Sequence, residues 1–226
     1  MLPDPVPELI PDPDFNLREH FRISSGRKLF LHIGSLLKRK GTLDILDSLR
    51  FLTEEELSGF ALLIIGHAGH EMDIGIRQRL PSAFNRQPAT DNRQPATCNL
   101  VTPAKAGAAP CIRYLNDFIS PSVFKSCIDQ CDLVVAPYRY TESSSGIAGH
   151  AIAAGKPLLC VRNGLLGEMI AENGTGVFIE GSNPACIAGG LKRALAADFT
   201  GRTSPEYIEL HSKEAFAGKI FETISG

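Results

Sequence analysis

Residues 28–34 read Lys-Leu-Phe-Leu-His-Ile-Gly, a short apolar run that ends at a glycine. Comparable runs recur along the chain, at residues 59–66, 112–115, 132–137, 156–161 and 176–179. They are apolar instead of alternating with polar residues, which is typical of strands covered on both faces of a parallel sheet. Stretches with helical periodicity separate them. The order predicts an α/β fold, a single doubly wound Rossmann-like domain whose mostly parallel six-stranded sheet has helices on both faces.

Capping signals mark where several of the expected helices begin. An N-cap residue followed by proline occurs at Ser120-Pro121, Asn183-Pro184 and Ser204-Pro205. Thr53, followed three residues later by Glu56, has the form of a capping box. We expect helices at residues 41–52, 71–82, 145–154, 165–172, 184–197 and 205–224, and another that starts at residue 121.

Two segments differ in character from the rest of the chain. Residues 1–28 carry five prolines within their first thirteen positions, so we expect an extended lead-in or linker ahead of a domain at residues 29–226. Residues 84–110 contain Asn-Arg-Gln-Pro-Ala-Thr twice, at 85–90 and 92–97. We interpret this stretch as a disordered loop insertion without function, and the alternative is a binding segment.

Composition excludes several classes of function. The chain has 226 residues and a net charge of -2, which disfavours a protein that coats nucleic acid. No apolar run approaches the roughly 20 residues that span a bilayer, and the N-terminus lacks the features of a secretory signal. The six cysteines include no Cys-x-x-Cys pair, and His67 and His70 have no third ligand nearby, so no metal site is predicted. We expect a reduced, cytoplasmic protein.

Three adjacent cations follow the first expected strand, at the entrance to a helix. They are Lys38, Arg39 and Lys40. The N-terminus of a helix repels cations, so an anionic ligand such as a diphosphate would explain their position. The alternative is a solvated basic loop.

A second polar loop follows the fourth expected strand. It runs from Glu142 through three serines to Gly146, at the start of a helix. Backbone N–H groups at such a start can cradle a phosphate, and glycine permits close approach. The alternative is a serine-rich N-cap. His150, one turn into the helix, either titrates near neutrality or is a packed residue.

The ordered series of motifs resembles the C-terminal, donor-binding domain of retaining family 4 glycosyltransferases of the two-domain GT-B type. The resemblance is carried by FLHIGSLLKRKGTLDILDSL at residues 30–49, by LLIIGHAG at 62–69 and by a nearly continuous stretch at 112–195. It covers most of the chain outside the repeat. It implies a nucleotide-sugar donor, such as a UDP-, GDP- or ADP-sugar, and no resident cofactor.

The resemblance also implies roles for particular residues. Lys40 matches a lysine on the donor diphosphate, and Glu142 matches the first glutamate of a Glu-x7-Glu motif; these two are the expected catalytic residues. The amides of Ser144, Ser145 and Gly146 would hold the phosphates. The remaining expected donor-binding residues are Gly34, Ser35, Lys38, Arg39, Phe118, Ile119, Ile147 and His150.

Two positions depart from the family pattern. Ser35 stands where an arginine is usual, and Lys38 or Arg39 would supply that charge. His150 replaces the second glutamate of the motif, and a neutral histidine cannot give a bidentate carboxylate grip.

The sequence begins at the stretch that resembles the interdomain linker, so we expect the acceptor domain in a separate partner chain. The alternatives are a non-catalytic nucleotide-sugar binding module, or an inactive remnant of a longer transferase. An unrelated dehydrogenase is a third reading, which the lack of Gly-x-Gly-x-x-Gly disfavours. Leu36, Leu37, Leu165 and Leu166 lie in the expected site loops, where an exposed apolar patch would favour a homodimer.

Overall fold

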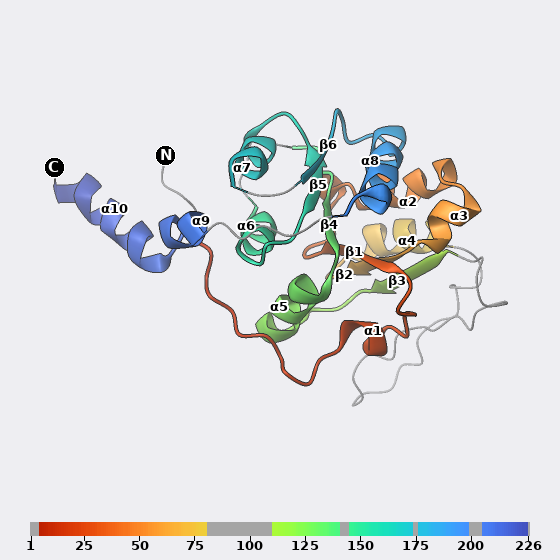
Figure 1. Ribbon diagram of the computed structural model, residues 1–226, viewed down its shortest axis with the longest axis horizontal. Helices are drawn as coiled ribbons and strands as arrows, with labels where there is room; N and C mark the ends of the chain where they lie inside the picture. Colours follow the sequence, from red (N-terminus) through yellow and green to blue (C-terminus); the bar gives the residue numbers. More distant parts are fainter. Residues whose placement is uncertain (1–4, 81–109, 141–144, 174–175, 199–204, 226) are drawn as a thin grey trace.

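Six parallel strands form the centre of the molecule. The computed structural model describes residues 5–80, 110–140, 145–173, 176–198 and 205–225. The strands pair in the order β3-β2-β1-β4-β5-β6 (Figure 1). Their bounds are β1 Lys28–Ile33, β2 Phe60–Ile65, β3 Cys111–Leu115, β4 Leu133–Ala136, β5 Leu158–Val161 and β6 Gly176–Ile179. The predicted fold class is confirmed.

Helices follow the strands and cover both faces of the sheet. They are α1 Leu17–His20, η1 Lys38–Lys40, α2 Thr42–Ser48, η2 Leu49–Phe51, α3 Glu54–Ser58, α4 His70–Arg79, α5 Pro121–Gln130, α6 Gly146–Ala153, α7 Leu165–Asn173, α8 Pro184–Ala196, α9 Pro205–Leu210 and α10 Lys213–Ser225, with η marking 3-10 turns. The caps predicted at Ser120 and Asn183 are confirmed, since each side chain accepts a hydrogen bond from the first turn of its helix. The capping box at Thr53 is confirmed as well.

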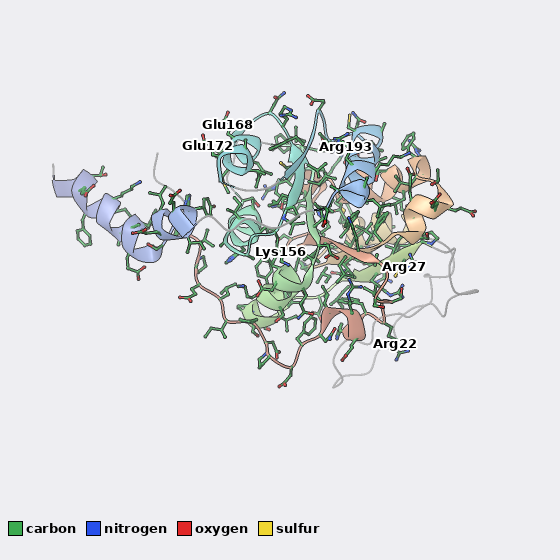
Figure 2. The ribbon with its side chains drawn as sticks, viewed as in Figure 1. Arg22, Arg27, Lys156, Glu168, Glu172 and Arg193 are labelled. Atoms are coloured by element: carbon green, nitrogen blue, oxygen red, sulfur yellow. The ribbon has the colours of Figure 1, made fainter. Side chains whose placement is uncertain are left out.

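Alternate residues of each strand point to opposite layers of core. On β1, Leu29, Leu31 and Ile33 face the layer that contains α1, α5, α6, α7 and α9. Phe30 faces the layer of α2, α4 and α8. Figure 2 shows charged side chains on the outside of these layers, among them Glu168 on α7 and Arg193 on α8.

The order of the strands creates a crevice at the middle of the sheet. β1 pairs with β2 on one side and with β4 on the other. The chain runs from β1 toward one edge of the sheet and from β4 toward the opposite edge. The loops that leave the carboxyl ends of β1 and β4 therefore diverge, and this is where ligands bind in open parallel sheets.

The described part of the lead-in is joined to the domain by hydrogen bonds at separate points. Val6 N–H donates to His211 O at 2.9 Å, and Asp12 N–H donates to Ser126 Oγ at 2.9 Å. Residues 5–16 contain no helix or strand, as their prolines predict. The short helix α1 that follows was not predicted; Asn16 caps it, and Leu17 and Phe21 bury their side chains in the core.

The prediction of one continuous helix at residues 205–224 is wrong. The chain forms α9 and α10, which are separated at His211 and Ser212. Ser212 Oγ accepts the N–H of Ala215 at 3.1 Å, so it caps a new helix instead of continuing the old one. Tyr207 on α9 is buried, whereas α10 extends away from the sheet (Figure 1).

Three further expectations concern the exposed apolar patch, the repeat with the N-cap at Ser204, and membrane-spanning segments. Leu36 and Leu166 are buried in the core, so they do not contribute to the expected exposed apolar patch. The repeat at 85–97 and the N-cap at Ser204 lie outside the described residues. In the parts of the chain that the structure describes, no helix is long and apolar enough to cross a membrane.

Candidate functional site

A cavity of about 580 Å³ opens at the carboxyl ends of β1 and β4. Its size lies in the range of small-molecule sites. The cavity brings together most of the residues singled out from the sequence, namely Gly34, Ser35, Arg39, Lys40, Phe118, Ile119, Ser145, Gly146, Ile147 and His150. Lys38 is exposed and does not line it. Glu142 and Ser144 lie outside the described residues.

Two glycines, Gly34 and Gly66, line this cavity with backbone atoms alone. Gly34 has φ +106, and a Cβ there would lie 2.5 Å from Ile147 Cδ1. Gly66 has φ +141, and its Cβ would lie 1.9 Å from Gly34 O. Both positions thus require glycine for conformation and for space. As a consequence the end of β1 approaches Ile147 of α6, and the end of β2 approaches the backbone of Gly34.

The basic loop after β1 is fastened to the loop after β4. Lys38–Lys40 form the 3-10 turn η1, and Gly41 follows at φ +77. The N–H of Arg139 donates to Arg39 O at 2.9 Å. The Arg139 guanidinium also makes two hydrogen bonds to the Asp44 carboxylate, at 3.0 and 2.8 Å. These contacts fix the position of η1 relative to the β4 loop.

Lys40 is a half-buried cation that has no anionic partner among the residues the structure describes. Its Nζ lies 3.8 Å from the centroid of the Tyr138 ring. Burial, with a further contribution from the charge of Arg39, lowers the pKa of Lys40 to about 8. Neither Lys40 nor Arg39 forms an ion pair with a carboxylate in the described part of the chain. A partly desolvated cation of this kind favours an anionic ligand.

His32 lies beneath this loop, and both of its ring nitrogens form hydrogen bonds within the protein. Its Nδ1–H donates to Val135 O at 2.8 Å, and its Nε2 accepts the hydroxyl proton of Thr42 at 2.9 Å. Burial lowers the pKa of His32 to about 4, so the ring is neutral at physiological pH. His32 therefore joins β1, β4 and α2 and has no free nitrogen for a ligand.

The start of α6 forms the opposite wall of the cavity. Ser145 occupies the N-cap position, but its side chain does not cap the helix. Its Oγ donates instead to the Tyr138 hydroxyl at 3.5 Å. A Cβ on Gly146 would meet nothing within 4 Å. The backbone N–H groups of the first helical turn have no partner within the helix, so this end suits an anion.

His150 is half-buried in the same helix. Burial, and to a lesser extent the charge of Lys125, lowers the pKa of His150. Its ring lies 5.3 Å from that of Phe124 in an edge-on arrangement. Of the two predictions for His150, the structure thus favours a packed residue. Its neutral imidazole can still donate or accept single hydrogen bonds with a ligand.

An aromatic pair lies at the mouth of the cavity, beyond β2 and β3. The ring of Phe118 is 78% exposed and stacks on His67 with centroids 4.5 Å apart. Asn116 holds the two loops together, because its side chain accepts from Ala68 N–H at 2.8 Å and donates to Ala68 O at 3.2 Å. No cluster of three or more possible metal ligands occurs among the described residues.

Sequence reasoning missed several residues of this cavity. His67 and Asp117 lie two residues beyond the ends of β2 and β3, so the rule that ligands bind at the carboxyl ends would have placed both at the cavity, whereas His67 was weighed only as a metal ligand. Leu9 could not be found, because only the path of the lead-in brings it to the cavity. Tyr138 does not itself line the cavity; it directly follows the proline after β4, and its sequence position does not reveal that its ring lies under Lys40, which does line it.

The strand order and the cavity at the divergence of the β1 and β4 loops define a doubly wound, Rossmann-like α/β domain. The chain belongs to the family described as glycosyl transferases group 1, whose profile matches residues 27–197. Together with the fold comparisons below, this match identifies the C-terminal domain of a GT-B glycosyltransferase.

Several solved structures share this fold. A UDP-forming α,α-trehalose-phosphate synthase from Burkholderia xenovorans has a TM-score of 0.62 at 14% identity, covering 93% of this chain and 46% of its own. A trehalose-6-phosphate synthase has a TM-score of 0.65 at 11% identity, with 97% and 47% covered. The HepE protein of Anabaena, in complex with UDP and glucose, has a TM-score of 0.56 at 15% identity, with 93% and 51% covered.

These identities establish a shared fold and nothing finer. The chain spans about half the length of the solved structures that it matches. Among curated proteins, none matches this sequence.

Proposed function

We propose that the cavity binds the diphosphate of a nucleotide sugar, as the donor site of a retaining family 4 glycosyltransferase. The observation that carries the proposal is Lys40, a half-buried cation that pairs with no carboxylate of the described residues and lines the same cavity as the N-terminus of α6. Arg39 adds a second cation. A diphosphate would satisfy both cations and the helix N–H groups at once.

The same groups would assist the transfer step. In glycosyl transfer the bond between the sugar and the diphosphate breaks, and negative charge grows on the departing phosphate. Preorganised cations and backbone N–H groups stabilise such charge without rearrangement. Lys40 is the residue we expect to stabilise this charge, whereas Glu142, the other expected catalytic residue, would accept hydrogen bonds from sugar hydroxyls.

The stacked rings of Phe118 and His67 support the mouth of the cavity as the place where the nucleobase binds. The exposed ring of Phe118, which rests on His67, offers a flat surface on which a base can stack. Two of the similar structures are described with UDP, one as a UDP-forming enzyme and one in complex with it. Uridine is therefore the first base to test, ahead of guanosine and adenosine.

Transfer to an acceptor needs a second binding surface, which we expect in a separate acceptor-domain chain. A non-catalytic nucleotide-sugar binding module is the second candidate. The neutral, half-buried His150 favours it, because an imidazole cannot replace the bidentate grip of a carboxylate on ribose hydroxyls. Release of UDP from UDP-glucose in the presence of a co-expressed acceptor chain would distinguish the two.

Binding of UDP, GDP and ADP is the direct test, measured by calorimetry and by thermal unfolding. A ligand that binds only the folded state raises its stability. We expect one nucleotide to stabilise the protein, Lys40→Ala to abolish the effect, and Lys38→Ala to retain it. Lys38 is the matched control because it neighbours Lys40 in the same turn but does not line the cavity. No response to any of the three at millimolar concentration would refute the donor site.

A further inference from the structure

Tyr138 lies between the two elements that line the anion end of the cavity. Its side chain is only 6% exposed. Lys40 Nζ, from the β1 loop, lies 3.8 Å above the centre of its ring. Ser145 Oγ, from the start of α6, lies 3.5 Å from its hydroxyl. One residue thus contacts a cation from one loop and the N-cap residue of the opposite helix.

The backbone around Tyr138 is fixed independently of any ligand. Its own N–H donates to Ala136 O at 2.8 Å, at the end of β4. The next residue, Arg139, is bound to Arg39 O and to the Asp44 carboxylate. Because hydrogen bonds fix both the Tyr138 backbone and the next residue, Arg139, the Tyr138 ring is a fixed surface on which the flexible Lys40 side chain can rest.

An aromatic ring suits this position better than a carboxylate would. The face of the ring attracts an ammonium group and offsets part of its desolvation. A carboxylate would hold Lys40 more strongly but would cancel its charge and repel a phosphate. The ring leaves the positive charge of Lys40 available to an incoming anion.

We propose that Tyr138 is a positioning residue of the donor site. Its ring holds the Lys40 ammonium at the cavity, and its hydroxyl holds Ser145 at the start of α6, so that the two phosphate-binding elements keep a fixed spacing. This role rests on the proposed binding of a diphosphate. The contact itself can be tested without any ligand.

The first measurement is the proton chemical shift of the Lys40 ε-methylene group by nuclear magnetic resonance, assigned by its loss in Lys40→Met. Close packing over a ring shifts this signal upfield. We expect the upfield shift in the wild type and in Tyr138→Phe, and its loss in Tyr138→Leu. A wild-type shift equal to that of solvent-exposed lysines would overturn the proposal.

The second measurement is calorimetric binding of pyrophosphate and UDP to the same proteins. Tyr138→Leu should bind about tenfold more weakly, in keeping with a partly desolvated cation–π contact. Tyr138→Phe should stay within about threefold of the wild type, because it keeps the ring and loses one long hydrogen bond. Tyr140→Leu is the matched control, since Tyr140 lies in the same loop with its side chain 68% exposed.

The outcomes distinguish the positioning role of Tyr138 from the proposed donor site. Equal binding by the wild type and a folded Tyr138→Leu would refute the positioning role. If Tyr138→Leu fails to fold, a Tyr138→Phe protein that loses both the upfield shift and binding would also refute it. A wild type that shows the shift but binds neither pyrophosphate nor UDP would refute the donor site, while the contact between Tyr138 and Lys40 would stand.

Discussion

At the scale of single residues, Lys40 shows how the fold changes the chemistry of a side chain. A lysine in solution keeps its proton well above neutral pH, with a pKa near 10.4. In the folded chain, burial and, to a lesser extent, the charge of Arg39 lower the pKa of Lys40 to about 8. The charge of this residue therefore depends on pH within a range that is accessible to experiment.

We expect nucleotide binding to weaken as pH rises through about 8. Lys40 is protonated below that value and loses its charge above it, so the attraction for phosphate is lost on the alkaline side. His150 and Tyr138 do not titrate in this interval, because burial lowers the pKa of His150 and raises that of Tyr138 to about 12. Calorimetric titration of UDP between about pH 7 and 9.5 measures the effect.

Lys40→Arg is the control for this pH dependence. Arginine stays charged throughout the range, so its affinity should be flat between the same pH values. A wild-type affinity that is also flat would contradict the assignment of the pH dependence to Lys40.

At the scale of elements, the end of α8 depends on a cation from another part of the chain. Lys28, at the start of β1, donates to the carbonyl oxygens of Leu195 at 2.9 Å and Ala197 at 2.6 Å. The last carbonyl groups of a helix have no partner within it, and a cation there also offsets the helix dipole. This contact fastens α8 to the first strand of the sheet.

Replacing Lys28 with methionine should lower the free energy of unfolding by about 1–2 kcal/mol, because the carbonyl groups at the end of α8 lose their donor. Urea denaturation measures the change. Lys192→Met is the matched control: Lys192 lies on the same helix and pairs with Glu56 at 3.2 Å across a partly exposed surface. The Lys192→Met substitution should lower the free energy of unfolding by less than about 1 kcal/mol. Equal effects of the two variants would argue against the capping role.

At the scale of the whole molecule, the N-terminal lead-in and α9 meet at α6. Val6 donates to His211 O, and the Tyr207 hydroxyl lies 3.4 Å from where a Cβ on Gly149 would be. Tyr207 is 1% exposed, whereas Phe221 on α10 is 71% exposed. The C-terminal segment thus contributes a core residue through α9, whereas α10 lies outside the core.

Tyr207→Ala should destabilise the protein by about 3 kcal/mol or more, as is usual when a large buried aromatic side chain is removed. Phe221→Ala should change stability by less than about 0.5 kcal/mol, because its ring is exposed. Thermal and urea unfolding of the two variants compare one aromatic residue from each helix. A large loss with Phe221→Ala would show that α10 packs against the domain in solution.

Much of the fold followed from local patterns. The strands were predictable because apolar runs bounded by glycine or proline need burial on both faces. The caps were predictable because Ser120 and Asn183 satisfy backbone N–H groups within their own first turns. The break between α9 and α10 was missed because Ser212 within a periodic stretch gives no clear sign of whether it caps or continues a helix.

The candidate site was predictable to the extent that it uses residues directly after strands. Gly34, Lys40 and Gly146 could be placed together because parallel strands end at the same edge of the sheet. Leu9 could not, because its position depends on the path of a segment without regular structure.

The sequence by itself determined the parallel sheet, the helix boundaries that capping signals mark, and the edge at which a ligand would bind. Burial, charge and spacing within the site were decided by the tertiary structure alone. Only the folded chain brings Tyr138 under Lys40 and sets Ser145 on the opposite side of that ring. The physical reason is that periodicity and capping act over a few residues, whereas desolvation and electrostatic contact depend on residues about a hundred positions apart.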